Sequence, residues 1–238
     1  MTGWVAGVDG CRAGWIAVLL PEAGPPQVFV TQRFADILAH ETEPGIIAVD
    51  MPIGLPDSVG PGGRGPERLV RAKLGERQSS VFAIPPRAAV MASDFAAATA
   101  ASLAASTPPR KVSRQAFGLF AKIREIDALM TAPLEARIYE SHPELAFWQL
   151  NAHAPMTLPK KVRGKSNPPG LAERRALLVR LGYDAGLLST PPRGAGLDDL
   201  LDAAVLALIA RRIARGEAMS FPAEPERDAK GLRMAIWA

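Results

Sequence analysis

The chain has 238 residues, of which 48% are hydrophobic and 22% charged, and its net charge is +4. This length and composition indicate one large α/β domain or two small ones. No apolar run approaches the ~20 residues that span a bilayer, and the N-terminal segment lacks the charged and apolar regions of a signal peptide. The single cysteine, Cys11, excludes an intrachain disulfide and a cysteine-built zinc site. We expect a cytoplasmic protein without a membrane partner, in an oligomeric state that the sequence leaves open.

The charge is distributed unevenly along the chain. Residues 60–180 hold 19 Lys/Arg against 9 Asp/Glu, whereas the two flanks together are acidic. A basic middle beside acidic ends suits a phosphate-bearing ligand such as a nucleic acid or a nucleotide. Solvated surface helices are an equally good explanation for any single basic cluster.

The first fifty residues predict three strands, a helix and a fourth strand. Short apolar runs at 3–9, 15–20 and 27–31, separated by Gly- and Pro-containing turns, indicate an antiparallel meander. Apolar residues spaced by three and four predict a short helix over 34–40. The next strand, 46–50, then lies parallel to the first by a right-handed crossover.

The rest of the chain is mainly helical in its pattern. Residues 52–66 are too rich in Gly and Pro for a regular element, and 151–170 resemble a loop. The spacing predicts helices over 67–76, 93–105, 113–130, 171–181 and 196–215, and strands over 134–139 and 231–237. No internal repeat is present, so we expect one domain over 1–238 with a helical, basic insertion at roughly 57–132.

Two of the predicted strands end in an aspartate, Asp9 and Asp50. A carboxylate at the tip of a buried strand is costly to desolvate unless it is paired or binds a metal. Each has a simpler explanation, because Asp9 precedes Gly10 in a favoured turn pair and Asp50 can stabilise a bend before Pro52. Their position on neighbouring strands favours a site for a hard cation.

The C-terminal helix begins with three further aspartates, Asp198, Asp199 and Asp202. Capping of the helix N-terminus explains Asp198 well but Asp202 poorly, because Asp202 lies a turn inside, among apolar residues. Like charges spaced by three and four residues repel one another and favour a bound cation. The sequence leaves open which of the three is a ligand.

Together with Glu140, at the end of another predicted strand, these acids form a candidate catalytic set: Asp9, Asp50, Glu140, Asp199 and Asp202. We expect Asp9, Asp50, Asp199 and Asp202 to bind metal, and Glu140 to bind metal or orient water. An oxygen-only ligand set favours Mg²⁺ or Mn²⁺. Two such ions about 4 Å apart activate water and stabilise the leaving oxygen in phosphodiester cleavage.

The β-β-β-α-β order, with acids on the first and fourth strands and on a late helix, resembles the ribonuclease-H-like fold. Four stretches resemble the bacterial family known as domain of unknown function 429, a set of predicted nucleases. They are residues 7–15 (GVDGCRAGW), 50–56 (DMPIGLP), 79–82 (SSVF, followed by Pro85 and Arg87) and 140–144 (ESHPE). The resemblance implies a mixed sheet flanked by helices and metal-dependent phosphodiester hydrolysis, although fold alone does not establish function. Unlike ribonucleases H, the first helix offers only Asp36, which lies opposite its apolar face.

Basic and hydroxyl residues provide candidate substrate contacts. The guanidinium groups of Arg77 and Arg87 match the geometry of phosphate oxygens. The alternative is that these arginines belong to a solvated helical segment and form salt bridges there. Lys160, Lys161 and Lys165 suit either a mobile phosphate clamp or a solvated loop. Phe82 is most simply a core residue. We assign substrate binding to Arg12, Arg77, Ser79, Ser80, Arg87, His142 and Lys161.

The sequence thus favours a divalent-metal-dependent nuclease. A nucleic-acid- or nucleotide-binding protein of the same fold that does not cleave is the alternative. An ATP-dependent phosphotransferase fits less well, because such proteins usually repeat the core in two lobes.

Overall fold

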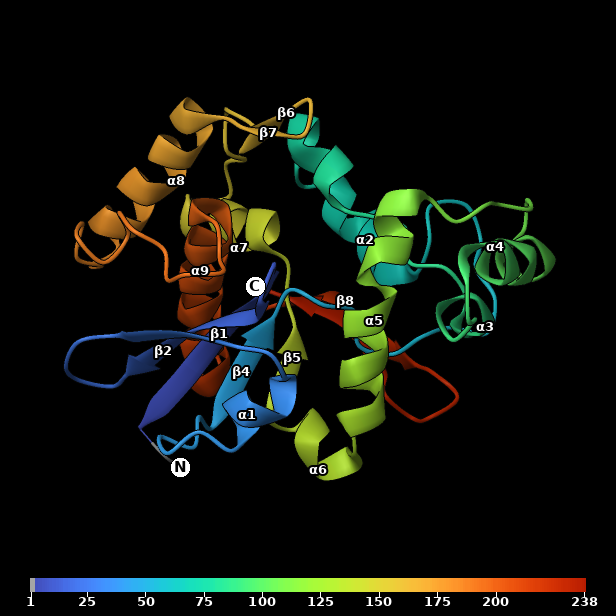
Figure 1. The fold of residues 1–238 in the computed structure, drawn as a ribbon, viewed down its shortest axis with the longest axis horizontal. Coiled ribbons are helices and arrows are strands. Elements are labelled where there is room, and N and C mark those ends of the chain that lie inside the picture. The colour runs from blue at the N-terminus through green and yellow to red at the C-terminus, as the bar shows by residue number, and fades with distance from the viewer. Residues whose placement is uncertain (1–2) are drawn as a thin grey trace.

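A five-stranded sheet lies at the centre of the computed structural model, which describes residues 3–238 (Figure 1). Its strands are β1 (Trp4–Cys11), β2 (Gly14–Pro21), β3 (Gln27–Thr31), β4 (Ile46–Val49) and β5 (Ile138–Glu140). The spatial order is β3-β2-β1-β4-β5, antiparallel from β3 to β1 and parallel from β1 to β5. The predicted meander and the parallel return through α1 (Phe34–Leu38) are therefore confirmed.

Helices cover both faces of this sheet because alternate strand residues point to opposite sides. Val5, Ile16 and Val18 pack with α9 (Leu197–Ala214), α7 (Pro143–Leu150) and α8 (Pro168–Arg180). Ala6, Val8 and Ala17, from the alternate positions, pack with α1 and α5 (Arg114–Leu129). Helix α9 lies directly against β1 and β4, so its first turns reach the edge where those strands end.

Helical segments fill the connection between β4 and β5, and most of them lie in the right-hand part of Figure 1. They are α2 (Gly65–Arg71), the 3₁₀ helix η1 (Gly75–Ser80), α3 (Arg87–Val90), α4 (Phe95–Ala104), α5 and α6 (Ala132–Glu135). None of the helices within residues 3–238 is long and apolar enough to cross a bilayer.

Two expected elements are shorter or different in the structure. The helix predicted over 67–76 ends at Arg71, and the chain continues into η1 through Gly75, whose φ is +50°. The strand predicted over 134–139 begins instead as helix α6, because Thr131 caps the amide of Leu134 and Pro133 occupies the first turn. Only the three residues of β5 are extended.

Several elements of the structure are not predicted by the sequence pattern. Helix α7 follows His142 and carries the signals of a helix start, Pro143 and Glu144. The expected loop over 151–170 contains a hairpin of β6 (Lys161–Val162) and β7 (Lys165–Ser166). The last strand, β9 (Arg233–Trp237), pairs with β8 (Ser220–Arg227) in a separate two-stranded sheet.

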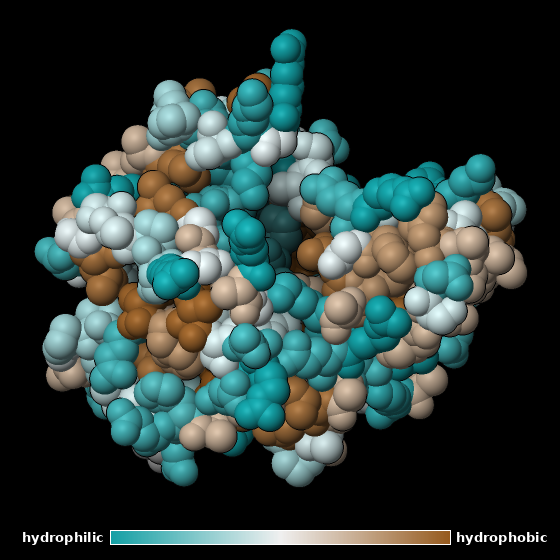
Figure 2. Space-filling model, viewed as in Figure 1, coloured by the Kyte–Doolittle hydropathy of each residue, from teal (hydrophilic) through white to brown (hydrophobic). Residues whose placement is uncertain are grey.

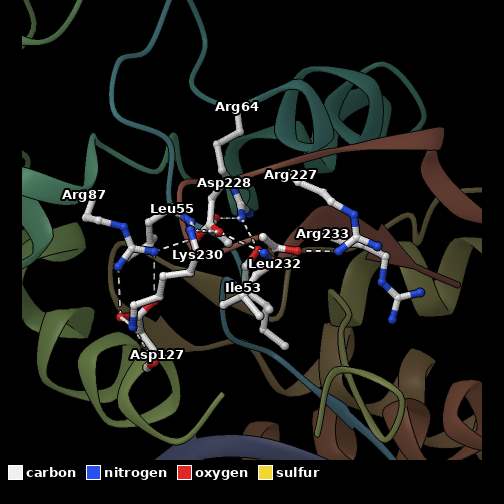
Figure 3. A network of polar contacts seen from close by, with 12 residues as sticks. Ile53, Leu55, Arg64, Arg87, Asp127, Arg227, Asp228, Lys230, Leu232 and Arg233 are labelled. Atoms are coloured by element: carbon white, nitrogen blue, oxygen red, sulfur yellow. Dashed lines mark hydrogen bonds and ion pairs between the residues drawn. The ribbon is translucent and has the colours of Figure 1, made fainter. Parts of the chain in front are cut away.

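A polar network fixes the loop that follows β4 (Figure 3). The carboxylate of Asp228 accepts hydrogen bonds from the amides of Leu55 and Leu232. On the other side of the loop, Arg64 donates to the carbonyl oxygens of Ile53 and Gly54. The Gly- and Pro-rich segment after Asp50 is irregular, as predicted, but its backbone polar groups are held by buried charges.

Candidate active site

Asp9 and Asp50 lie side by side at the carboxyl ends of β1 and β4. Val8 and Val49 are register partners in these parallel strands, and the amide of Asp50 donates to the carbonyl of Val8 over 3.0 Å. Asp9 is buried, and one of its carboxylate oxygens accepts the amide of Gly10 at 2.7 Å. Asp9 lies within β1, opposite Ile16, and the turn itself falls at residues 12–13, so the turn role considered for Asp9 is wrong.

Gly7 allows α9 to bring a third carboxylate to this edge. A Cβ at Gly7 would collide with the carbonyl oxygen of Ala203 and the amide of Ala207, so only glycine permits this close approach. Asp202 immediately precedes Ala203 on α9 and is 97% buried. Its charge and that of Asp50 both act on Asp9.

The three helix aspartates have different partners, which separates their roles. Asp198 forms an ion pair with Lys161 at 2.6 Å, and Asp199 accepts the amide of Gly196 at 2.8 Å as a helix cap. Asp202 alone of the three is buried beside Asp9 and Asp50. The structure therefore favours Asp202 as the helix residue of the site, with Asp199 at its margin.

Lys160 supplies a cation among these carboxylates. Its Nζ forms an ion pair with Oδ2 of Asp202. Burial alone would lower the pKa of Lys160, but the charges of Asp202, Glu144 and Asp9 outweigh it and raise that pKa above its usual value. Lys160 therefore remains an ammonium ion at neutral pH.

The pKa values of Asp9, Asp50 and Asp202 are all raised, which means that the ionised form of each carboxylate is disfavoured in the folded protein. Burial, followed by the charges of Asp50 and Asp202, raises the pKa of Asp9 well above its usual value. Burial raises the pKa of Asp50 to about 6, and that of Asp202 to about 6 against the opposing charge of Lys160. One ammonium thus compensates three clustered acids only in part, an arrangement typical of functional sites.

A cavity of about 510 Å³ opens over this cluster. Figure 2 shows a hollow with a mainly hydrophilic lining between the part that carries α8 and α9 and the part that carries α2 and α5. The cavity is lined by Asp9, Asp50, Arg77, Ser79, Ser80, Phe82, His142, Glu144, Lys160, Lys161, Asp198, Asp199 and Asp202, among others. An adjoining cavity of about 170 Å³ shares Asp9, Asp50 and His142 and is otherwise mostly apolar.

Three buried polar atoms of the cavity wall have no hydrogen-bond partner within residues 3–238. They are Oδ1 of Asp202, Nε of Arg77 and Nδ1 of His142. A buried polar atom without a partner is costly and is usually matched by a ligand, an ion or water. A carboxylate, a guanidinium and an imidazole left in this state around one cavity indicate a binding site for a polar ligand.

The tautomer of His142 follows from its one contact. Its Nε2 lies 3.3 Å from the carbonyl oxygen of Ser80, which only accepts hydrogen bonds. Burial lowers the pKa of His142, so the ring is neutral at pH 7 with its proton on Nε2. The other nitrogen, Nδ1, is therefore an acceptor.

Glu140 makes structural contacts through both of its carboxylate oxygens. One of its oxygens forms an ion pair with Arg64 at 2.5 Å, and the other accepts the amide of Ile53 at 2.8 Å. Arg64, also fully buried, is shared with Glu67. Burial raises the pKa of Glu140 to about 7 even so. Both oxygens are thus engaged in fixing the loop after β4, but Glu140 also lines the smaller cavity together with Asp9 and Asp50, so its assignment as a ligand stays a prediction.

The expected substrate residues divide into two groups. Arg77, Ser79, Ser80, His142 and Lys161 all line the larger cavity, although Lys161 is exposed and paired with Asp198. Arg87 instead donates to Asp127 and Asp228 in the network of Figure 3, and its assignment to phosphate is corrected to a structural one. Arg12 is exposed in the turn between β1 and β2, and it is not among the residues that line either cavity.

Two residues of the site were underestimated from the sequence. Lys160 was grouped with its neighbours in a mobile clamp, yet it is the lysine that reaches the carboxylates. Glu144 lines the cavity while its oxygens pair with the buried Arg174 at 2.7 Å. The signal for Glu144 was the helix start at Pro143; nothing local distinguishes Lys160 from Lys161.

The carboxylate oxygens of Asp9, Asp50 and Asp202 are of the kind that binds a hard divalent cation, but they do not form a preformed metal site. Within the described part of the chain, no three His, Cys, Asp or Glu side chains already stand together as a metal-binding group. The free Oδ1 of Asp202 and the incompletely compensated charge of Asp9 and Asp50 are nevertheless what such a cation requires.

The sheet order and the flanking helices make this a mixed α/β protein, as expected of a ribonuclease-H-like fold. A family model described as "Protein of unknown function (DUF429)" matches residues 7–227, and the chain belongs to this family. Neither the curated proteins nor the solved structures include a significant match.

Proposed function

We propose that this protein is a divalent-metal-dependent nuclease that hydrolyses phosphodiester bonds. The observation that carries the proposal is the convergence of the buried carboxylates of Asp9 and Asp202 and the half-buried carboxylate of Asp50 on a cavity that also presents basic groups. Asp9 and Asp50 would hold Mg²⁺ or Mn²⁺, with Asp202 beside them. A bound ion of this kind lowers the pKa of water and neutralises charge on phosphate oxygens.

The remaining groups of the cavity suit a phosphate ester. Arg77 presents a guanidinium whose Nε is unpartnered among the described residues, and a guanidinium binds phosphate oxygens through charge-assisted hydrogen bonds. The free Nδ1 of His142 accepts a hydrogen bond from water or from a sugar hydroxyl. Lys161 also lines the cavity and is half exposed, and a substrate phosphate would compete with Asp198 for its ammonium group.

The smaller apolar cavity supports a nucleic-acid or nucleotide substrate over a simple phosphate ester. Phe82 is partly exposed and lines both cavities, with Met51 and Leu119 in the smaller one. An aromatic ring beside a phosphate site is a stacking surface for a base. At about 170 Å³ this cavity is below the 300–1,000 Å³ typical of drug-sized ligands, so it suits a single base.

The test is cleavage of single-stranded, hybrid and branched nucleic acids with Mn²⁺, comparing the wild-type chain with Asp9→Asn. We expect the variant to lose activity by about 10³-fold or more, since removal of a group that acts on the reacting atoms commonly costs this much. Asp36→Asn is the matched control, because Asp36 pairs with Arg33 on the surface of α1. Equal rates for wild type and Asp9→Asn would refute the proposal.

The same experiment addresses the alternative of a protein that binds without cleaving. Binding that persists in EDTA, weakens steeply with salt and never leads to cleavage would favour that alternative.

A further inference from the structure

Lys160 occupies a fixed position, although it belongs to a loop. Hydrogen bonds join two consecutive residues of the loop before β6, Thr157 and Leu158, to helix α8. Glu173 accepts the amides of Thr157 and Leu158 at 2.8 and 3.0 Å, and Arg174 donates to the carbonyl of Leu158 at 2.8 Å. The backbone of Lys160 itself accepts the amide of Asn167 at 2.9 Å. The expectation of a mobile clamp therefore does not describe this lysine.

The anchor of this loop is itself buried and paired. Arg174 is fully buried, and its guanidinium donates to both carboxylate oxygens of Glu144, at 2.7 and 2.8 Å. A bidentate pair of this kind fixes geometry as well as charge. Glu144 lies on α7 and lines the cavity, so α7, α8 and the loop hold Lys160 from outside the carboxylate cluster.

The side chain of Lys160 stands where a cation is required. Its Nζ pairs with Asp202, its charge acts on Asp9 and Asp50, and its side chain is only 23% exposed. An ammonium ion is a compact point charge, comparable in role to a metal ion as a counter-charge. The other oxygen of Asp202, Oδ1, has no partner in the part of the chain that the structure describes.

We propose that Lys160 is a permanent cation of the active site, filling one cation position that the three carboxylates define. The site consequently takes one divalent ion fewer than its carboxylates would hold without the lysine. In the proposed reaction, on which this role in catalysis rests, the ammonium ion stabilises negative charge that develops on the phosphate and does not exchange with solvent cations. Asp202 positions the ammonium rather than serving only as a metal ligand.

The test is the number of Mn²⁺ ions bound per chain, measured by calorimetric titration of the full-length protein at pH 7.5. Lys160→Met keeps most of the apolar stem and removes the charge. We expect Lys160→Met to bind one more ion than the wild type, whatever the wild-type number is. Lys165→Met, an exposed position of β7 in the same hairpin, is the control and should bind the wild-type number. An unchanged number in Lys160→Met would overturn the proposal.

A second variant keeps the result interpretable if Lys160→Met folds poorly. Lys160→Met/Asp202→Asn removes both charges of the ion pair and should not gain the extra ion, because the carboxylate that would hold it is absent. A gain of one ion in this double variant would also contradict the proposal.

The outcome is separable from that of the proposed function. Wild-type cleavage with an unchanged ion number in Lys160→Met would leave the nuclease proposal standing and remove the role of Lys160. If the wild type binds no ion and does not cleave, but Lys160→Met binds one ion, the role of Lys160 stands and the nuclease proposal is refuted.

Discussion

Gly7 of β1 and Ala203 of α9 are in direct backbone contact, and a Cβ on Gly7 would collide with the carbonyl oxygen of Ala203. This contact holds the start of α9, where Asp202 immediately precedes Ala203, against β1, the strand that carries Asp9. The absence of one side chain therefore determines how closely two carboxylates of the site approach.

Gly7→Ala is expected to destabilise the protein by about 2–4 kcal/mol, because the added methyl group must push a buried helix away from the sheet. Urea denaturation measures the change. Gly118→Ala in α5 is the matched control, since a Cβ there has nothing within 4 Å. In a helix this control should stabilise slightly, by about 0.5–1 kcal/mol. Equal stability of wild type and Gly7→Ala would show that α9 adjusts freely.

The second prediction concerns the pH dependence of stability. The pKa of Asp50 is about 6 in the folded protein and near 3.8 when unfolded, so the folded state binds the proton more tightly. The stability associated with this group is fully present below pH 4 and is lost as the pH rises through 6. Asp50→Asn cannot ionise and should exceed the wild type in stability by roughly 1–3 kcal/mol above pH 6.5.

This difference is measured by denaturation in EDTA from pH 4 to pH 8. It should be small near pH 4 and level off above pH 6.5. Saturating Mn²⁺ should reduce or reverse it, since the ion binds only the wild-type carboxylate. A difference that is constant over the whole range would show that Asp50 has an ordinary pKa.

The third prediction separates the two arginines that the sequence treated alike. Arg77→Met should lower kcat/KM for nucleic-acid cleavage by about 10–100-fold, because its guanidinium lines the cavity, while stability changes by less than about 0.5 kcal/mol. Arg87→Met should leave kcat/KM of the folded protein nearly unchanged but lower the stability. Loss of Arg87 leaves Asp127 and Asp228 poorly compensated, at an expected cost of about 2–4 kcal/mol. Substrate binding weakened only in Arg87→Met would contradict both assignments.

The fourth prediction concerns Glu140. If Glu140 is structural, Glu140→Gln should bind Mn²⁺ within about two-fold of the wild type but lose stability, because its single amide oxygen can accept from only one of Arg64 and Ile53. Arg64→Met should cost about 3–5 kcal/mol of stability, because it leaves Glu67 and Glu140 buried without their partner. Mn²⁺ titration and urea denaturation measure the two effects. Loss of metal binding in Glu140→Gln would identify Glu140 as a ligand.

Much of the architecture could be predicted because its signals are local. Apolar runs ending at turns identify β1 to β4, and the spacing of apolar residues identifies α5 and α9. Where local signals conflict, the expectation was wrong. Thr131 and Pro133 start a helix inside a segment whose composition suggested a strand, and α2 ends at Arg71, before the 3₁₀ helix that begins at Gly75, although the pattern would have continued it.

The roles of the charged residues depended on contacts between distant segments. Arg77 and Arg87 are ten residues apart and equally basic, yet one lines the cavity and the other meets Asp228, 141 positions away. Lys160 and Lys161 are adjacent, but Lys160 pairs with the buried Asp202 and Lys161 with the more exposed Asp198.

By itself, the sequence determined the sheet, the last helix and the positions of Asp9 and Asp50, because strand ends and helix starts are encoded by neighbouring residues. Only the tertiary structure decided that Asp202 is buried beside Asp9 and Asp50. It also decided that Glu140 forms an ion pair with Arg64, and that Lys160 is the lysine that pairs with Asp202. The physical reason is that a charge acquires its role from what is buried beside it, and burial is a property of the packed chain.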